Sequence, residues 1–147
     1  MTRYPDWQSK LHQFFKANLE RPFAWGTWDC CLFVADAVQA MTGTDIAAAF
    51  RGKYSDEPGA MRAVLAALGG NKTGGAWPEL LSELAAKTAV EHAMAEVAPL
   101  FAQRGDMVVT AQCLGLVSFT GQHVLVIPES GFHMVPLEQV IRAWRVG

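Results

Sequence analysis

The sequence has no apolar run long enough to cross a bilayer and no long run of like charges. A membrane span needs about 18 consecutive apolar residues, so we expect no contact with a membrane. Residues 1–15 also lack the apolar core and cleavage site of a signal peptide, which predicts that the chain stays where it is synthesised. The 12 basic and 14 acidic residues give a net charge of −2. The chain therefore has no excess of positive charge of the kind that binds nucleic acid, and we expect no nucleic-acid partner.

Cysteine is also scarce, and its three positions, Cys30, Cys31 and Cys113, exclude several kinds of site. An odd number with two neighbours does not make a disulfide framework, so we expect reduced thiols. Adjacent cysteines point apart on a helix, whereas structural zinc sites prefer about two to four intervening residues. The glycine pairs at 69–70 and 74–75 lack the strand and lysine of a phosphate loop. We therefore expect no metal and no cofactor.

What the chain does contain is enough apolar sequence for one core. It has 147 residues, 51% of them hydrophobic, which predicts a single domain over residues 1–147. Apolar residues at spacings of three and four, with Asp6 as a candidate N-cap, predict a first helix that ends before Pro22. A second helix from Asp29 should stop at Gly43. Further helices are predicted over 45–50, 58–68 and 77–86, with a flexible connector at 69–75 and an open choice between helix and extended chain over 87–104.

After residue 105 the pattern changes to short β-branched runs. Strands are predicted at 106–111, 113–119, 123–128 and 132–135, with a tight turn at Thr120, Gly121 and Gln122 between the second and third. Residues 137–146 are predicted to form a short helix or turn followed by a last strand. Helices first and strands second predict an α+β fold, with N-terminal helices packed on a small antiparallel C-terminal sheet.

The adjacent cysteines should have different roles. Cys30 is predicted at a helix N-terminus, where free N–H groups and the macrodipole lower the pKa of a thiol. Cys31 shares the helix face of Val34 and Val38, so it should point into the core while Cys30 points toward the preceding loop. The alternative is that both are small core residues, as free cysteines commonly are. The tryptophans of that loop are expected to pack in the core.

Residues 25–34, W-G-T-W-D-C-C-L-F-V, resemble the Y/W-G-G…D-C-S-G-L-V box of the NlpC-type peptidoglycan endopeptidases. These are papain-like cysteine peptidases of bacterial cell walls and phage tails. The family's second box begins with G-D, and R-G-D-M-V-V-T at 104–110 is similar and follows in the same order. The resemblance runs from about residue 20 to the end, although Cys31 and Leu32 replace the usual Ser-Gly. It implies a papain-like fold with Cys30 in the position of the nucleophile.

A nucleophilic cysteine needs a general base within reach, normally a histidine oriented by a third polar group. In the family the base opens a strand after the G-D box, in a motif like H-V-G-I-Y, and a second polar residue follows on the next strand. Two alignments compete. In the first, C-L-G-L-V at 113–117 is that strand, and Cys113 occupies the position of the base. In the second, H-V-L-V-I at 123–127 is the strand, with His123 as the base and His133 as the orienting group.

The two alignments exclude each other. A tight turn at 120–122 puts Cys113 and His123 at opposite ends of a hairpin, roughly 20 Å apart at about 3.3 Å per residue. Only one of them can face Cys30. The remaining histidines, His12 and His92, are predicted to be surface or capping residues.

We favour the first alignment, because C-L-G-L-V and the ending V-P-L…A-W-R-V at 135–146 resemble a divergent group encoded in siphophage tail gene clusters. That resemblance implies a structural component of a tail tip or baseplate hub with an incomplete catalytic dyad. Its partners would be other hub proteins, and its location the virion tail after synthesis in the host cytoplasm. The alternative is an active cysteine endopeptidase, a hydrolase in which Cys30 attacks cell-wall peptide during genome entry and His123 transfers the proton.

Overall fold

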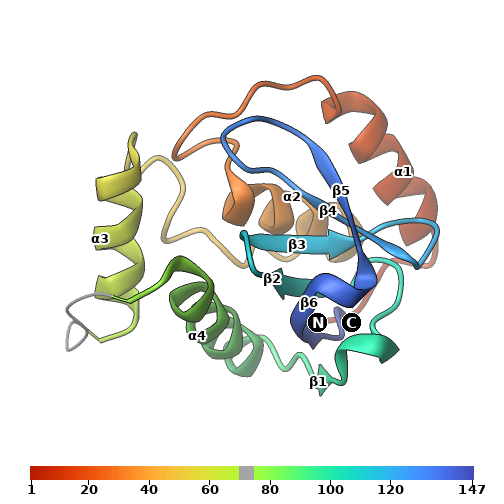
Figure 1. Cartoon of the computed structure of the whole chain (residues 1–147). Helices are drawn as coiled ribbons and strands as arrows, with labels where there is room; N and C mark the ends of the chain where they lie inside the picture. The colour runs from red at the N-terminus through yellow and green to blue at the C-terminus, as the bar shows by residue number, and fades with distance from the viewer. Residues whose placement is uncertain (70–74) are drawn as a thin grey trace.

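The computed structural model describes residues 1–69 and 75–147, and it places four α-helices beside one antiparallel sheet of six strands within those ranges (Figure 1). The helices are α1 Trp7–Asn18, α2 Cys30–Thr42, α3 Glu57–Ala67 and α4 Trp77–Glu91. The strands are β1 Glu96–Val97, β2 Met107–Thr110, β3 Leu114–Val117, β4 His123–Val126, β5 His133–Pro136 and β6 Val140–Trp144. The predicted α+β class is confirmed. No helix in the described part of the chain is long and apolar enough to cross a membrane.

The sheet has the strand order β1-β6-β2-β3-β4-β5, so the last strand lies between the first two. The predicted turn joins β3 to β4, where the Ser118 N–H donates to the His123 carbonyl at 2.8 Å. Opposite residues further along this pair are Val117 with Val124 and Gly115 with Val126. The register therefore carries His123 to one end of the hairpin and Cys113 toward the other.

Helix α2 is the centre of the core, because it lies between α1 and the sheet (Figure 1). Its buried side chains occur on nearly every side, as expected for a helix that other elements surround. It ends as predicted at Gly43, which has a left-handed φ of 78° and donates its N–H to the Gln39 carbonyl. Helix α3 contacts α4 and stands farther from the sheet (Figure 1). The position of α2 leaves its N-terminal turn next to the start of β3.

Two local predictions need correction, and one open choice is resolved. Residues 45–50 form turns and not a helix, because the Asp45 carboxylate accepts the Ala47 N–H and the Arg51 guanidinium and so closes a side-chain turn. Helix α4 continues past residue 86 to Glu91, which resolves part of the open stretch as helix, and β1 and a 3-10 turn follow. Asp6 stands at the N-cap of α1, but its side chain makes no capping hydrogen bond. Of the predicted connector, residues 70–74 lie outside the described part of the chain.

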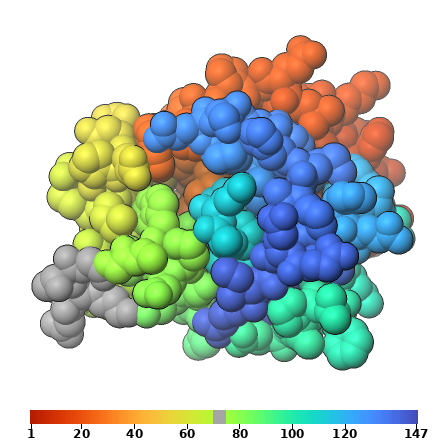
Figure 2. All heavy atoms as spheres, viewed as in Figure 1, coloured from red at the N-terminus to blue at the C-terminus, as the bar shows by residue number. Residues whose placement is uncertain are grey.

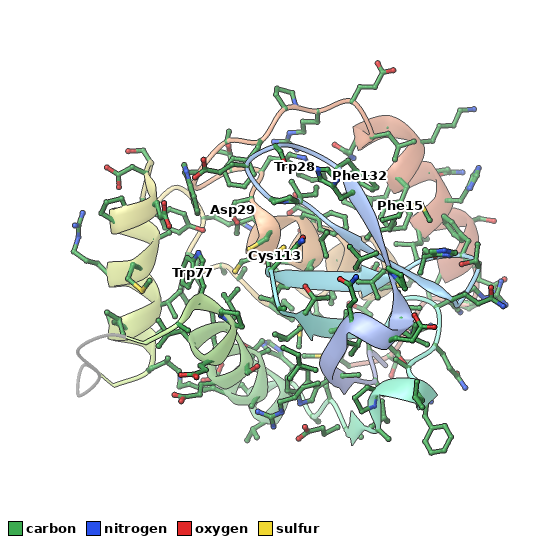
Figure 3. The ribbon with its side chains drawn as sticks, in the orientation of Figure 1. Phe15, Trp28, Asp29, Trp77, Cys113 and Phe132 are labelled. Carbon is green, nitrogen blue, oxygen red and sulfur yellow. The ribbon has the colours of Figure 1, made fainter. Side chains whose placement is uncertain are left out.

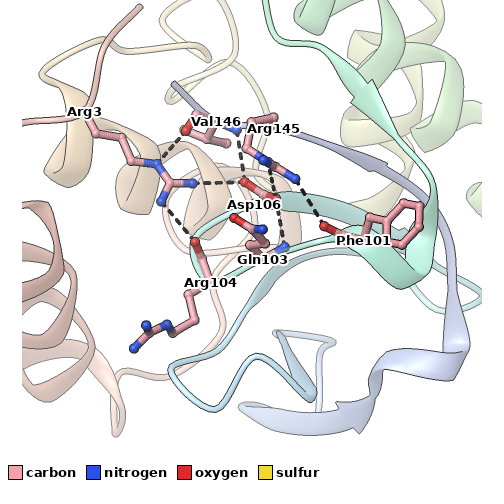
Figure 4. A network of polar contacts seen from close by, with 7 residues as sticks. All are labelled: Arg3, Phe101, Gln103, Arg104, Asp106, Arg145 and Val146. Atoms are coloured by element: carbon pink, nitrogen blue, oxygen red, sulfur yellow. Dashed lines mark hydrogen bonds and ion pairs between the residues drawn. The ribbon is translucent and has the colours of Figure 1, made fainter.

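The aspartate of the G-D motif joins the two ends of the chain to β2 (Figure 4). The Asp106 carboxylate is fully buried and accepts from Arg3 Nη2 and Arg145 Nε, each at 2.9 Å. The backbone N–H groups of Gln103 and Val146 donate to the same carboxylate at 2.9 and 3.2 Å. Arg3 also donates to the carbonyls of Val146 and Arg104. One buried carboxylate therefore satisfies donors from three separate segments.

Candidate functional site

The N-terminal turn of α2 is held by Asp29, the aspartate of the D-C motif. Its side chain is 1% exposed and accepts the N–H groups of Cys31 and Leu32 at 3.1 and 3.0 Å, which is the expected bonding of an N-cap. The other carboxylate oxygen accepts the Gly26 N–H at 3.0 Å and the Tyr54 hydroxyl at 2.6 Å. Asp29 is therefore fully used in fixing the helix start against two loops.

The loop before α2 depends on the glycine of the W-G motif. Gly26 has a φ of +84°, in the region that favours glycine, and a Cβ there would overlap the Tyr54 carbonyl. Gly26 also accepts a backbone hydrogen bond from Gly52 at 3.0 Å. The close approach brings Tyr54 within reach of Asp29. Burial, followed by the contact with Asp29, raises the pKa of the Tyr54 hydroxyl, so it remains a donor.

Three thiols meet at this helix start. Cys30 Sγ lies 3.9 Å from Cys31 Sγ, and the Cys113 thiol interacts with Cys30 from the residue before β3. Cys30 and Cys113 are both buried, with 8% and 4% exposure. Figure 3 shows Cys113 at the start of β3, near the turn of α2 that carries Asp29. The structure thus brings together Cys30 and Cys113, the pair of the first alignment.

The thiols differ in how readily they lose a proton. The hydrogen bond from Cys113, and then that from Cys31, lower the pKa of Cys30 well below its ordinary value. The interaction with Cys30, followed by burial, raises the pKa of Cys31 and of Cys113. The negative charge of Asp29 opposes ionisation of Cys30. Cys30 therefore ionises first, and its neighbouring thiols are the main cause.

The adjacent cysteines line different cavities, but the predicted division of burial is wrong: Cys30 is buried in the main core and Cys31 is only partly buried. Cys31 lines a cavity of about 40 Å³ inside the apolar core, together with Val34 and Ala35. Cys30 faces a different cavity, of about 180 Å³. It is lined by the loop before α2, the starts of α3 and α4, and residues 112–113 and 127–129, whose orange, yellow, green and blue regions meet around a hollow in Figure 2. Its lining consists of aromatic, acidic and apolar side chains together with the two thiols: Phe23, Trp25, Cys30, Glu57, Trp77, Gln112, Cys113, Ile127, Pro128 and Glu129.

The two tryptophans of the loop before α2 have different surroundings. Trp28 is buried in the main core, as predicted, whereas Trp25 is half-buried and forms part of the wall of the Cys30 cavity. Trp77, at the start of α4, forms another part (Figure 3). Aromatic side chains therefore frame the approach to the thiols.

The structure does not bring His123 to Cys30. His123 opens β4 at the far end of the hairpin, where its Nδ1 lies 3.3 Å from Thr120 Oγ1. His133 lies opposite Val126, at the same end of the sheet as Cys113, but it is exposed and its Nε2 lies 2.9 Å from Ser130 Oγ. His133 lines a separate cavity that shares only Gln112 and Pro128 with the Cys30 cavity. Among the described residues, no histidine lines the Cys30 cavity.

The other two histidines lie where the sequence predicts. His12 is exposed on α1 and packs edge-on against Phe119, and His92 is the C-cap residue of α4.

Two residues that contribute to the site, Tyr54 and Glu57, are not predicted by any sequence motif. Tyr54 lies in an irregular loop, and Glu57 begins a separate helix, so their distance in sequence from the D-C motif hides their proximity. Within the described residues, no group of three or more candidate ligands could hold a metal ion.

Comparison with known proteins places the chain in a family. The model described as Domain of unknown function (DUF6950) matches residues 2–146, nearly the whole chain, and the chain belongs to this family. No curated protein and no solved structure matches it.

Proposed function

We propose that this member of the DUF6950 family is a structural component of a bacteriophage tail tip or baseplate hub. In this proposal the chain has a papain-like, NlpC-type fold that keeps the position of the nucleophile and has lost the catalytic base. It would be made in the cytoplasm of the bacterial host and carried in the virion tail, with other hub proteins as its partners.

The observation that carries the proposal is the thiol of Cys113 beside Cys30. A cysteine peptidase needs a base that accepts the proton of the nucleophile and later protonates the leaving amine. Cys113 cannot take that role at neutral pH, because interaction with Cys30 and burial raise its pKa and keep it protonated. His123, the base of the alternative mechanism, opens β4 at the other end of the hairpin.

The two motifs that resemble the peptidase boxes both serve the architecture here. Asp29 occupies the N–H groups of Cys31 and Leu32, which are among the helix-start donors that an oxyanion would need. Asp106 is fully engaged in joining the chain termini to β2. A scaffold that preserves these contacts without a base is consistent with an assembly module.

The surface also offers apolar side chains for partners. Leu100 and Phe101 are 73% and 72% exposed on the 3-10 turn Pro99–Phe101, which contacts β6, and Ile141 of β6 is 49% exposed. Exposed apolar side chains are common at protein interfaces. These residues are candidates for the contact with a neighbouring hub protein.

Genetic complementation tests the proposal directly. In the phage that encodes this protein, a null mutant should yield tails without a complete tip. The Cys30→Ala variant should restore infectivity to the wild-type level, while Phe101→Glu should restore it poorly. The purified protein should release no peptide fragments from cell wall. Loss of infectivity with Cys30→Ala, at a normal level of folded protein, would contradict a purely structural role.

An active cysteine endopeptidase remains the second candidate, and the lowered pKa of Cys30 favours it. That function predicts fragment release from purified peptidoglycan by the wild-type protein. It also predicts that Cys30→Ala abolishes the release, and that His123→Ala does so only if His123 leaves its place at the turn end of the hairpin. The same assay therefore separates the two functions.

A further inference from the structure

We propose that Cys30 and Cys113 form a reactive thiol pair that small disulfides without negative charge oxidise to an intramolecular disulfide. This inference does not depend on the proposed function, because the bond can form whether or not the chain is part of a tail. It assigns chemistry to a cavity that no histidine lines among the described residues.

The first support is the arrangement of the three sulfurs. Cys31 Sγ lies 3.9 Å from Cys30 Sγ, and Cys113 lines the same cavity as Cys30, so Cys30 has two candidate partners. Cys31 follows Cys30 directly in α2, and a bridge between adjacent helical residues would require the helix start to open. Cys113 lies just before β3, far from α2 in sequence, and lines the same cavity as Cys30. The partner of Cys30 is therefore Cys113, although Cys31 is next to it in sequence.

The second support is access. Cys30 and Cys113 line the same cavity of about 180 Å³, which gives a small reagent a path to both sulfurs. Cys31 lines a different cavity, of about 40 Å³, in the apolar core, although Cys31 is less buried than Cys30. The Cys30 cavity also carries Glu57 and Glu129, and no basic side chain among the described residues lines it. Its charge should attract a cationic disulfide and repel an anionic one.

The reaction balances without a further oxidant. The Cys30 thiolate attacks one sulfur of the small disulfide, forms a mixed disulfide and expels one small thiolate. Cys113 then loses its proton to water, and its thiolate attacks Cys30 Sγ and expels the second small thiolate. Both small thiolates take up protons according to their pKa values. Overall, two protein thiols are oxidised and one small disulfide is reduced to two thiols.

Mass spectrometry of the intact protein and of its peptides tests the pairing. After treatment of the whole chain with bis(2-hydroxyethyl) disulfide, the protein should lose two hydrogens, and the cross-linked peptides should contain Cys30 and Cys113. Cys113→Ser should accumulate a mixed disulfide on Cys30. The control Cys31→Ser should cross-link like the wild type. A bridge that includes Cys31, or Cys30 left unmodified in the wild type, would overturn the proposal without needing any variant to fold.

Three reagents of similar size test the charge preference: cystamine, bis(2-hydroxyethyl) disulfide and dithiodiglycolate. The rate at which each reagent reacts with the protein is divided by the rate at which the same reagent reacts with 2-mercaptoethanol. This ratio removes differences in the intrinsic reactivity of the three reagents. At low salt, the cation should react faster than the anion by roughly tenfold or more. Replacing Glu57 and Glu129 together by glutamine should bring the normalised rates together. Equal normalised rates in the wild type would overturn the assigned reagent class. These assays involve neither infectivity nor cell wall, so failure here is distinct from failure of the proposed function.

Discussion

Replacing Asp106 with alanine should destabilise the protein strongly, because its carboxylate joins three segments of the chain. The substitution removes the shared acceptor of Arg3, Arg145 and the backbone N–H groups of Gln103 and Val146. Breaking a buried ion pair typically costs about 3–5 kcal/mol, since the remaining charge stays uncompensated. Each backbone N–H left without an acceptor costs about 1–3 kcal/mol. These contributions overlap and do not add.

Solvent access reduces part of this cost. The Arg145 side chain is 34% exposed and can regain water, whereas the Arg3 side chain is 14% exposed and can regain less. We therefore expect Asp106→Ala to lower the free energy of unfolding by about 4 kcal/mol, within the range for a broken buried pair. For a chain of this size, that corresponds to a decrease in Tm of roughly 10 °C.

Urea denaturation at pH 7, followed by tryptophan fluorescence, measures the change. Glu96→Gln is the matched control, because Glu96 also accepts two bonds from one arginine, Arg142, at 2.7 and 2.8 Å. That pair is exposed, so its loss should cost about 1 kcal/mol or less. If Asp106→Ala were no more destabilising than Glu96→Gln, the assigned role of the G-D motif would be refuted.

Three further predictions concern the site and its surroundings. Gly26→Ala should cost at least about 2 kcal/mol in urea denaturation, since it combines a positive φ with a backbone overlap; an unchanged midpoint would contradict the close approach of the two loops. Arg51 holds the pKa of Asp45 below its ordinary value, so this stabilisation is complete above the unfolded-state pKa of about 4 and is lost as pH falls through the folded-state pKa. The stability difference between wild type and Asp45→Asn, measured in urea over a pH series, should accordingly be present at pH 7 and shrink below about pH 4; a constant difference would exclude this cause. Cys113→Ala should raise the pKa of Cys30, because it removes the main hydrogen bond to that thiolate. The pH dependence of iodoacetamide alkylation would show this rise, and an unchanged profile would argue against the contact.

Much of the fold could be predicted because the relevant signals are local. The periodicity of apolar residues located α1, α2 and α3 to within a few residues, and the change to β-branched runs located the strands after residue 105. The turn between β3 and β4 followed from three residues of turn chemistry. The incorrect helix over 45–50 has a cause that local periodicity does not reveal, since Arg51 and Ala47 both bind the Asp45 side chain.

The site was predictable only in part. The placement of Cys30 at a helix N-terminus followed from the D-C motif, but the expected source of its reactivity was the helix itself. In the structure, Asp29 takes up helix-start N–H groups and opposes ionisation, and the hydrogen bond from Cys113 is the larger influence. Tyr54, which donates to Asp29, was missed because it lies 25 residues away in an irregular loop.

By itself, the sequence determined the α+β class, the order of the elements and the requirement that Cys113 and His123 lie at opposite ends of one hairpin. These follow from residue spacing and turn geometry, which act over a few neighbouring positions. Only the tertiary structure decided which end of that hairpin faces Cys30. That choice depends on how β3 packs against α2. Packing between segments that are distant in sequence is decided by which apolar faces of the helices and the sheet are buried against each other, and residue spacing does not show this. The same packing joined the thiols, the aromatic walls and the two glutamates around one cavity.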